Sequence, residues 1–369
     1  MIYELEEMLE ELSEASNHNG YLYSVKDILI IMVCGLLCGL QTVSSIKQWA
    51  TVPRNAKFFN EIYGINKIPC IAQIYNILRT VDASFFEKCF IKWMKELIKG
   101  DIQGKTIALD GKSIRSTGKR FYDKSIMHIA SAIISESQLV IGSAECDKST
   151  GEIDAVRHLI KILDIEGAVV VADALHCQTE TAEAVIAAKA DYLFIVKGNQ
   201  KNLKESVDLL SYNKRTDTDS TVEINGGRVE TRTAYVSNQI DTLYNKEIWQ
   251  NISCVGVIHR EFEKNGKVTT QNHYYISSKD MTATELLHHA RMEWRVEVMH
   301  WLLDVHFDED KTRLLSKKVQ KSFNLMRKIV LNLVKEYQTS LPKQQAQSAI
   351  MRSNLFDIDN LKSFIAHFA

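Results

Sequence analysis

The chain has 369 residues, of which 45% are hydrophobic and 25% charged. This is longer than one core requires, and the composition is that of an ordinary soluble globular protein. The formal net charge of −1 excludes nucleic-acid binding through an overall basic surface, so such binding would need local segregation of charge. The seven cysteines are scattered without a CxxC pair or zinc spacing, which indicates reduced thiols in a cytosolic protein.

Residues 1–100 predict an all-helical N-terminal domain. The apolar run Ile28–Leu40 is shorter than the about 20 residues that span a membrane, so we expect a buried core helix and no membrane partner. Ser24 and Asp27 resemble a capping box at its start. Pro53 predicts a break between two short helices, and Ser84 predicts the cap of the last helix. The helices are expected at 46–50, 57–63, 71–80 and 85–99. A helix-turn-helix-like reader of DNA around 67–80 is an alternative to a solvated face.

Residues 101–210 alternate between strands and helices. Strands are expected at 105–109, 126–135, 139–144, 168–172 and 192–196, and helices at 154–163 and 179–188, the second capped by Thr179 or Thr181. Three antiparallel strands extended by βα units are the order of an RNase H-like core. The predicted fold class is therefore α/β, with an RNase H-like catalytic core and the helical N-terminal domain.

Residues 211–278 predict a β-rich insertion, with strands in 221–236 and 253–278 and Gly-containing turns at 226–227 and 266. Residues 279–337 are expected to complete the core with a long helix, 282–303, and a basic helical region, 312–337. That region has an apolar stripe of Phe323, Met326, Val330 and Leu333. Residues 338–369 predict a polar tail with little organisation apart from a terminal helix.

Two carboxylates follow apolar strands directly. Asp110 ends the first predicted strand and Asp173 ends the fourth, and these strands are neighbours in the predicted order, so their ends can meet. A third carboxylate is expected from the helix 291–304, where Glu293, Glu297 and Asp304 lie near one face. Converging carboxylates suit Mg²⁺, and phosphoryl transfer on DNA uses two such ions. The alternatives are a helix cap for Asp173 and ordinary surface ion pairs for the glutamates.

Several segments resemble one family in the right order along the chain. ADALHCQ, DYLFIVKGNQ and KSTGEIDAVRHLIKILDIEG resemble the central segment of the ISAs1-group, or H-repeat-associated, transposases. IPC with the segment after it, and WRVEVMHWLLDV, are similar to the same family, and the resemblance runs from about residue 20 to about 335. These proteins are DDE transposases with an RNase H-like catalytic domain.

The resemblance implies site residues. Asp110, Asp173 and Glu297 would form the catalytic triad and hold two Mg²⁺ (or Mn²⁺) ions, with Glu293 the main rival of Glu297. The chain departs from the family at Glu293, where a basic residue or His is usual, and at Val298, where Asn is common. His176 and His300 are expected to support or pack against the site and not to bind metal.

Basic and polar residues suggest contacts with DNA. The candidates are Lys112, two residues after Asp110; the turn Lys197, Asn199 and Gln200; Arg228 and Arg232 in GRVETR; and Lys317, Lys318, Lys321, Arg327 and Lys328 of the basic helix. In GRVETR, alternation puts the two arginines and Glu230 on one strand face, where a cross-strand ion ladder is the alternative. A solvated side chain is the alternative for each lysine.

The function that the resemblance implies is that of an insertion-sequence transposase. Such an enzyme cuts DNA strands at the element ends in a metal-dependent step and joins them to target DNA. Its partners would be double-stranded DNA and a second protomer in a homodimer, in the bacterial cytoplasm and associated with the nucleoid. Two alternatives stay open: a metal-dependent nuclease without strand transfer, and a domesticated, non-catalytic DNA-binding protein.

Overall fold

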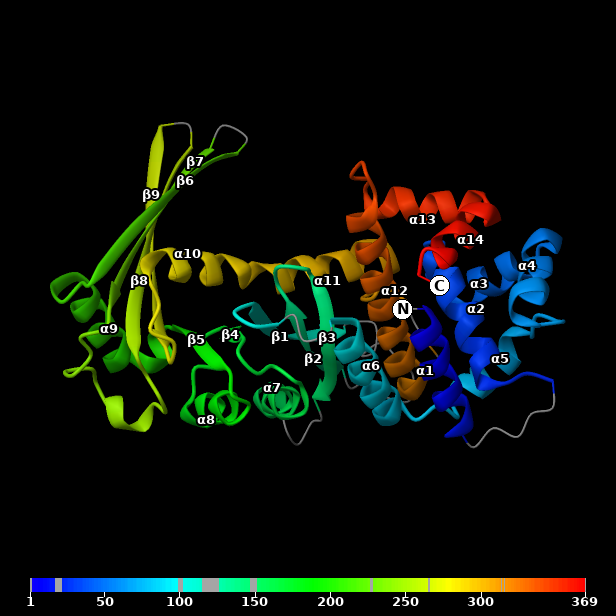
Figure 1. The fold of residues 1–369 in the computed structure, drawn as a ribbon, viewed down its shortest axis with the longest axis horizontal. Coiled ribbons are helices and arrows are strands. Elements are labelled where there is room, and N and C mark those ends of the chain that lie inside the picture. Colours follow the sequence, from blue (N-terminus) through cyan, green and yellow to red (C-terminus); the bar gives the residue numbers. More distant parts are fainter. Residues whose placement is uncertain are drawn as a thin grey trace.

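The computed structural model describes residues 2–16, 22–98, 102–114, 126–146, 151–225, 228–264, 266–312, 314 and 316–368. The fold is α/β: one nine-stranded sheet runs through the molecule, and a group of helices stands at one end of it (Figure 1). The strand order is β3-β2-β1-β4-β5-β9-β8-β7-β6. The predicted turn at 226–227 and the predicted helix end at Lys99 lie outside the described residues.

The N-terminal part is helical, as predicted. The capping box is confirmed, because Ser24 Oγ accepts the Asp27 N–H and an Asp27 oxygen accepts the Ser24 N–H. Pro53 opens α4 as its first residue, where the missing N–H has no helical partner to lose. Asp82, not Ser84, caps α6, since its Oδ1 accepts the Ser84 N–H at 2.8 Å. The helices are α1 (Ile2–Glu14), α2 (Val25–Leu37), α3 (Val43–Ala50), α4 (Pro53–Tyr63), α5 (Ile71–Leu78) and α6 (Ala83–Ile98).

The core strands follow the predicted RNase H-like order. β1 pairs antiparallel with β2, β2 pairs antiparallel with β3, and β4 joins β1 and β5 in parallel. β1 continues well past the predicted end at Leu109 because Ile114 still pairs with Met127 of β2. Asp110 therefore lies inside a strand and not directly after one. The strands are β1 (Thr106–Ile114), β2 (Met127–Ile134), β3 (Leu139–Cys146), β4 (Val169–Ala172) and β5 (Asp191–Val196).

Helices connect these strands. α7 (Gly151–Ile162) and α8 (Thr179–Ala187) lie close to their predicted positions, but Gln178 is the N-cap residue of α8, not Thr179 or Thr181. The short 3-10 turn η2 (Gly198–Gln200) leads into α9 (Lys201–Asn213), a helix that the sequence reading missed. α9 packs on the strands that follow it.

The β-rich segment extends the core sheet. β6 (Asp217–Asn225), β7 (Arg228–Ser237), β8 (Cys254–Lys264) and β9 (Lys267–Ser277) form an antiparallel ribbon, with the 3-10 turn η3 (Lys246–Ile248) between β7 and β8. β9 pairs with β5, so the ribbon and the core share one hydrogen-bonded ladder. The ribbon strands extend past α10 (Figure 1).

Two helices cross the sheet nearly end to end (Figure 1). They are α10 (Ala283–Met292) and α11 (Trp294–Phe307), which correspond to one predicted helix divided at Glu293. α10 packs on ribbon strands and α11 on β1 and β2. α7 covers the opposite face, since a Cβ atom on Gly111 would lie 2.3 Å from the Glu152 carboxyl carbon on α7.

The C-terminal helices complete the helical end. α12 (Lys317–Ser340) is buried along most of its length and packs on α2, α6 and β3, so the predicted basic helical region is a core helix. The prediction for the tail is corrected in part. Its terminal helix is confirmed as α14 (Ile358–Ala366), but the segment before it also forms a helix, α13 (Gln347–Phe356). The two helices bury Ile350, Leu361 and Phe364. None of the described helices is long and apolar enough to cross a membrane.

Candidate active site

Asp110 and Asp173 lie on neighbouring strands. Leu109 of β1 pairs with Ala172 of β4, and the two aspartates follow these paired residues. Both side chains are partly exposed. Asp173 Oδ1 accepts the Leu175 N–H at 2.8 Å, so the turn after β4 orients this carboxylate. The sheet register therefore brings the two predicted aspartates together.

Glu293 and Glu297 add two carboxylates from the junction of α10 and α11. Burial raises the pKa of Glu293 to about 7; the positive charge of Lys197 opposes this, and the negative charges of Asp173, Glu297 and Asp110 add to it. Glu297 is exposed in the first turn of α11. The charges of the three predicted carboxylates thus each act on the rival Glu293. Such a set of oxygen donors fits a hard divalent cation.

Two histidines stand beside these carboxylates. His300 Nε2 on α11 lies 3.4 Å from Asp110 Oδ2. His176, after β4, is buried with Nε2 3.4 Å from Glu152 Oε1 on α7. Neither imidazole has a hydrogen-bond partner within the described part of the chain. His300 therefore lies against Asp110, whereas the side chain of His176 lies against Glu152 of α7.

The turn after β5 supports the loop that carries Asp173. Asn199 Nδ2 donates to the Ala174 carbonyl at 2.8 Å, and Gln200 Nε2 donates to the Cys177 carbonyl at 3.3 Å. These amides, which the sequence suggested as DNA contacts, hold the loop in place. Lys197 is exposed and faces the site, as its effect on Glu293 indicates. The local sequence could not predict the two amide contacts, because each joins the turn after β5 to the loop after β4, which lies one helix and one strand earlier in the chain.

Lys112 is engaged inside the protein. Its Nζ lies 2.7 Å from Asp304 Oδ1 and 2.8 Å from Glu309 Oε2, and its side chain is 15% exposed. Burial lowers the pKa of Lys112, but the charges and hydrogen bonds of Glu309 and Asp304 outweigh it and leave the pKa raised. The expected phosphate contact is therefore corrected, because the ammonium group already has three carboxylate partners, the third being Asp310 at 3.9 Å.

The basic helix contributes less surface charge than the sequence suggested. Lys328 is buried and its Nζ donates to Ser131 Oγ at 2.9 Å, and Arg327 is buried with its guanidinium 4.8 Å from the centre of the Phe323 ring. The expected phosphate contacts of these two residues are wrong, because α12 is a core helix. Lys321 pairs with Glu145. Lys318 is exposed and Lys317 is partly exposed.

Arg228 and Arg232 take part in a cross-strand ion ladder, the alternative that the alternation left open. Glu230 Oε2 lies 3.0 Å from Arg228 and Oε1 lies 2.5 Å from Arg232, and Arg260 of β8 pairs with the same carboxylate. Burial opposes ionisation of Glu230, but the Arg260 hydrogen bond and the three guanidinium charges lower its pKa. The ladder ties β7 to β8, and the Arg228 side chain stays 36% exposed.

A histidine–glutamate cluster lies at the other end of β1. The donor atoms of Glu136, His288 and His289 lie within 4.8 Å of one another. Glu136 also accepts from the Thr106 N–H and hydroxyl, and His289 Nδ1 lies 2.8 Å from that hydroxyl. Asp110 is four residues further along the strand, roughly 13 Å at the usual rise. The cluster fastens α10 to the start of β1 and is separate from the predicted carboxylates.

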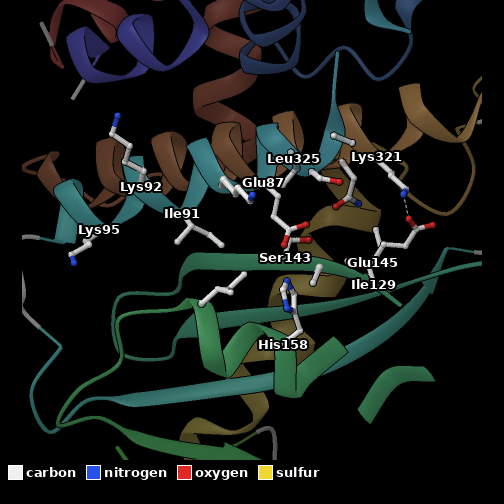
Figure 2. A pocket seen from close by; sticks show the side chains of 16 residues that line it. Glu87, Ile91, Lys92, Lys95, Ile129, Ser143, Glu145, His158, Lys321 and Leu325 are labelled. Atoms are coloured by element: carbon white, nitrogen blue, oxygen red, sulfur yellow. Dashed lines mark ion pairs between the residues drawn. The ribbon is translucent and has the colours of Figure 1, made fainter. Parts of the chain in front are cut away.

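A cavity of about 510 Å³ lies between α6, α7, α12 and β3 (Figure 2). Lysines line it, but Lys92 pairs with Glu11, Lys95 with Asp164 and Lys321 with Glu145. The balanced charge gives no reason to expect an anion there. The cavity contains none of the predicted catalytic carboxylates.

The sequence comparisons agree with the fold. A family model described as Transposase DDE domain matches residues 81–333, and one described as DDE_Tnp_1-associated matches residues 6–94. The chain belongs to the DDE transposase family. The resemblance to the H-repeat-associated transposases is thereby confirmed, and the match covers every strand of the sheet.

Curated relatives of this DDE transposase span nearly its whole length. "Putative transposase YncI" of Escherichia coli O157:H7 is 33% identical over 327 residues, covering 85% of this chain and 83% of that protein. "H repeat-associated putative transposase YhhI" of Escherichia coli K12 is 29% identical over 376 residues, covering 96% and 98%. A cryo-EM structure of a piggyBac transposase synaptic complex with hairpin DNA aligns with a TM-score of 0.48 at 12% identity, covering 98% of this chain and 79% of that chain.

Proposed function

We propose that this protein is an insertion-sequence transposase that cuts DNA at the ends of its element and joins the cut end to target DNA. The observation that carries the proposal is that Asp110 and Asp173 follow paired residues of the adjoining strands β1 and β4. Burial raises the pKa of Glu293 at the α10–α11 junction, and the negative charges of Asp173, Glu297 and Asp110 add to that rise. Membership in the DDE family supports the same assignment.

Asp110, Asp173 and Glu297 are the proposed catalytic carboxylates and metal ligands, with Glu293 the rival for the third position. Two Mg²⁺ (or Mn²⁺) ions, when bound, would supply Lewis-acid activation of the attacking oxygen and stabilisation of the leaving oxygen. The turn after β4 orients Asp173 through the Leu175 N–H. The amides of Asn199 and Gln200 steady that turn.

The proposed chemistry has two displacements at phosphorus. Water attacks a phosphodiester at the element end, its oxygen bonds to phosphorus, and the P–O3′ bond breaks to leave a 3′-hydroxyl. That hydroxyl then attacks a target phosphodiester, and one target P–O3′ bond breaks in exchange. The protein forms no covalent bond to DNA in either step, so no Ser or Tyr nucleophile is assigned.

The proposed partners are double-stranded DNA at the element ends and at the target, and a second copy of this chain to hold two ends together. Lys197, Lys317 and Lys318 are the proposed backbone contacts, with Arg228 and Arg232 of the ribbon as further candidates near strand ends. Binding through such contacts would weaken steeply with salt. A bacterial cytoplasmic, nucleoid-associated location would follow from this function.

The test uses DNA from the flanks of the gene. Labelled duplex carrying those flanks is incubated with wild-type protein, Asp173→Asn, Glu297→Gln and Glu293→Gln, in Mg²⁺ or in EDTA. Asp241→Asn, whose side chain is 90% exposed in a distant loop, is the matched control. We expect metal-dependent cleavage at a defined end by wild type and control, and loss of at least about 100-fold in Asp173→Asn and Glu297→Gln.

Each other outcome has a clear reading. Loss in Glu293→Gln but not in Glu297→Gln would move the third carboxylate to Glu293. Cleavage without joining to an added target duplex would identify a nuclease. Salt-sensitive binding without cleavage by any of the proteins would identify a non-catalytic DNA-binding protein. Undiminished cleavage by Asp173→Asn would refute the proposed site.

A further inference from the structure

Lys112 and α11 meet in a regular arrangement. On β1, Asp110 and Lys112 are two residues apart and share the face that α11 covers. On α11, their respective partners His300 and Asp304 are four residues apart. Two residues of strand advance about 6.6 Å and four residues of helix about 6 Å. The helix therefore lies along the strand in the same direction, with two contacts at matching intervals.

The second contact is the stronger one. Lys112 Nζ bridges Asp304 Oδ1 on α11 and Glu309 Oε2 just beyond it, at 2.7 and 2.8 Å. The Glu309 side chain is 2% exposed, and Asn324 Nδ2 of α12 donates to its other oxygen. One ammonium group thus joins β1, the end of α11 and, through Glu309, the core helix α12. Charge-assisted hydrogen bonds in such a partly buried setting hold a defined geometry.

We infer that Lys112 is a positioning residue: with Asp304 and Glu309 it fixes the register of α11 on β1, and so the place of Glu297 relative to Asp110. The inference rests on the proposed function for its catalytic meaning. Glu297 lies two helical turns before Asp304 on the same helix. A helix freed at Asp304 can slide or rotate along the strand, which would move Glu297 away from Asp110 and Asp173.

The test compares Lys112→Met and Asp304→Asn with the control Lys246→Met, which removes a surface lysine from a distant loop. Hydrogen exchange of full-length protein reports whether α11 is held, and Mn²⁺ binding measured by electron paramagnetic resonance reports whether the carboxylates are in place. Both variants should speed exchange in 294–307 and weaken Mn²⁺ binding by about 10- to 100-fold, as losses of supporting contacts at metal sites do. The double variant should be little worse than either single one.

DNA binding in EDTA, measured against salt concentration, separates this role from a phosphate contact. The positioning role predicts an unchanged salt slope, whereas loss of a phosphate contact would lower the slope by about 0.9. Unchanged exchange in α11, unchanged Mn²⁺ affinity or a reduced salt slope in Lys112→Met would each overturn the inference. If wild-type protein binds no Mn²⁺, the proposed metal site fails, while the exchange data still decide whether Lys112 holds α11.

Discussion

Replacing Glu309 by Gln should destabilise the fold strongly. Burial opposes ionisation of Glu309, but the charges of Lys112, Lys328 and Arg327 outweigh it and lower the pKa of the carboxyl group. Burial also lowers the pKa of Lys328 to about 8 and of Arg327 to about 10, with the charge of Glu309 opposing the shift in each case. The carboxylate is therefore the charge that all three cations share.

The magnitude follows from which cations lose their partner. Lys112 keeps Asp304 at 2.7 Å, so its loss is partial. Arg327 has no hydrogen bond from its guanidinium within the described residues, and with Glu309 gone it loses its main charge partner and keeps the weaker effects of Asp308 and Asp304. Removing the main partner of a buried charge costs about 3–5 kcal/mol. We expect a loss toward the lower end, about 3 kcal/mol, because Lys328 can release its proton.

Urea unfolding followed by far-ultraviolet circular dichroism measures the loss. Glu183→Gln, on the exposed side of α8, is the matched control and should change stability by less than about 0.5 kcal/mol. Adding Arg327→Met to Glu309→Gln should restore part of the lost free energy of unfolding, because it removes the buried guanidinium that has lost its main charge partner. A loss below about 1 kcal/mol in Glu309→Gln, or no recovery in the double variant, would refute the reasoning.

Three further predictions concern other parts of the chain. Burial lowers the pKa of His289 from 6.5 to about 4, so on acidification the unfolded chain takes up the proton before the folded protein does. About 3 kcal/mol of folding stability, fully present above pH 6.5, should therefore be lost as the pH falls towards 4. In urea unfolding, His289→Gln should flatten this dependence of stability on pH. Gly35→Ala should lower the thermal unfolding midpoint, because the added Cβ would lie 2.5 Å from Ile46 Cγ2. The overpacking costs about 1–3 kcal/mol, which exceeds the gain of about 1 kcal/mol in helix propensity. An unchanged midpoint would contradict the packing of α2 on α3. Asn199→Ala should speed hydrogen exchange in the loop after Asp173, whereas Gly198→Ala, whose Cβ meets open space, should leave it unchanged.

The strand order and the positions of Asp110 and Asp173 on neighbouring strands could be predicted, because apolar runs and the polar residues that follow them are local patterns. The buried environment of Lys328 could not be predicted from the sequence. Its charge suggests a surface, and the hydroxyls that accept its hydrogen bonds come from Ser131 and Ser143, on strands far away in the chain. The predicted phosphate contact of Lys112 is wrong for the same reason, since its partners Asp304 and Glu309 are distant in the sequence and meet it only in the folded protein.

Element boundaries failed where pairing or capping outweighed local preference. β1 runs on to Ile114 through polar residues because β2 supplies hydrogen-bond partners throughout. α9 was missed because its sequence directly follows a polar turn and carries few apolar residues, of which Leu203, Val207 and Leu210 are buried. The alternation of residues in β7 does not distinguish a DNA-contacting face from an ion ladder on Glu230. The ladder could be recognised only in the fold, where Arg260 of the next strand pairs with Glu230.

The continuity of the sheet has a mechanical consequence. β9 closes the ribbon directly onto β5, and β5 is hydrogen-bonded to β4, the strand that ends at Asp173. A ladder of backbone hydrogen bonds in series is stiff along the row of strands, and α10 braces it by packing on β6, β7 and β8. A load applied to the ribbon strands would therefore pass through β9 and β5 to β4, the strand that Asp173 follows.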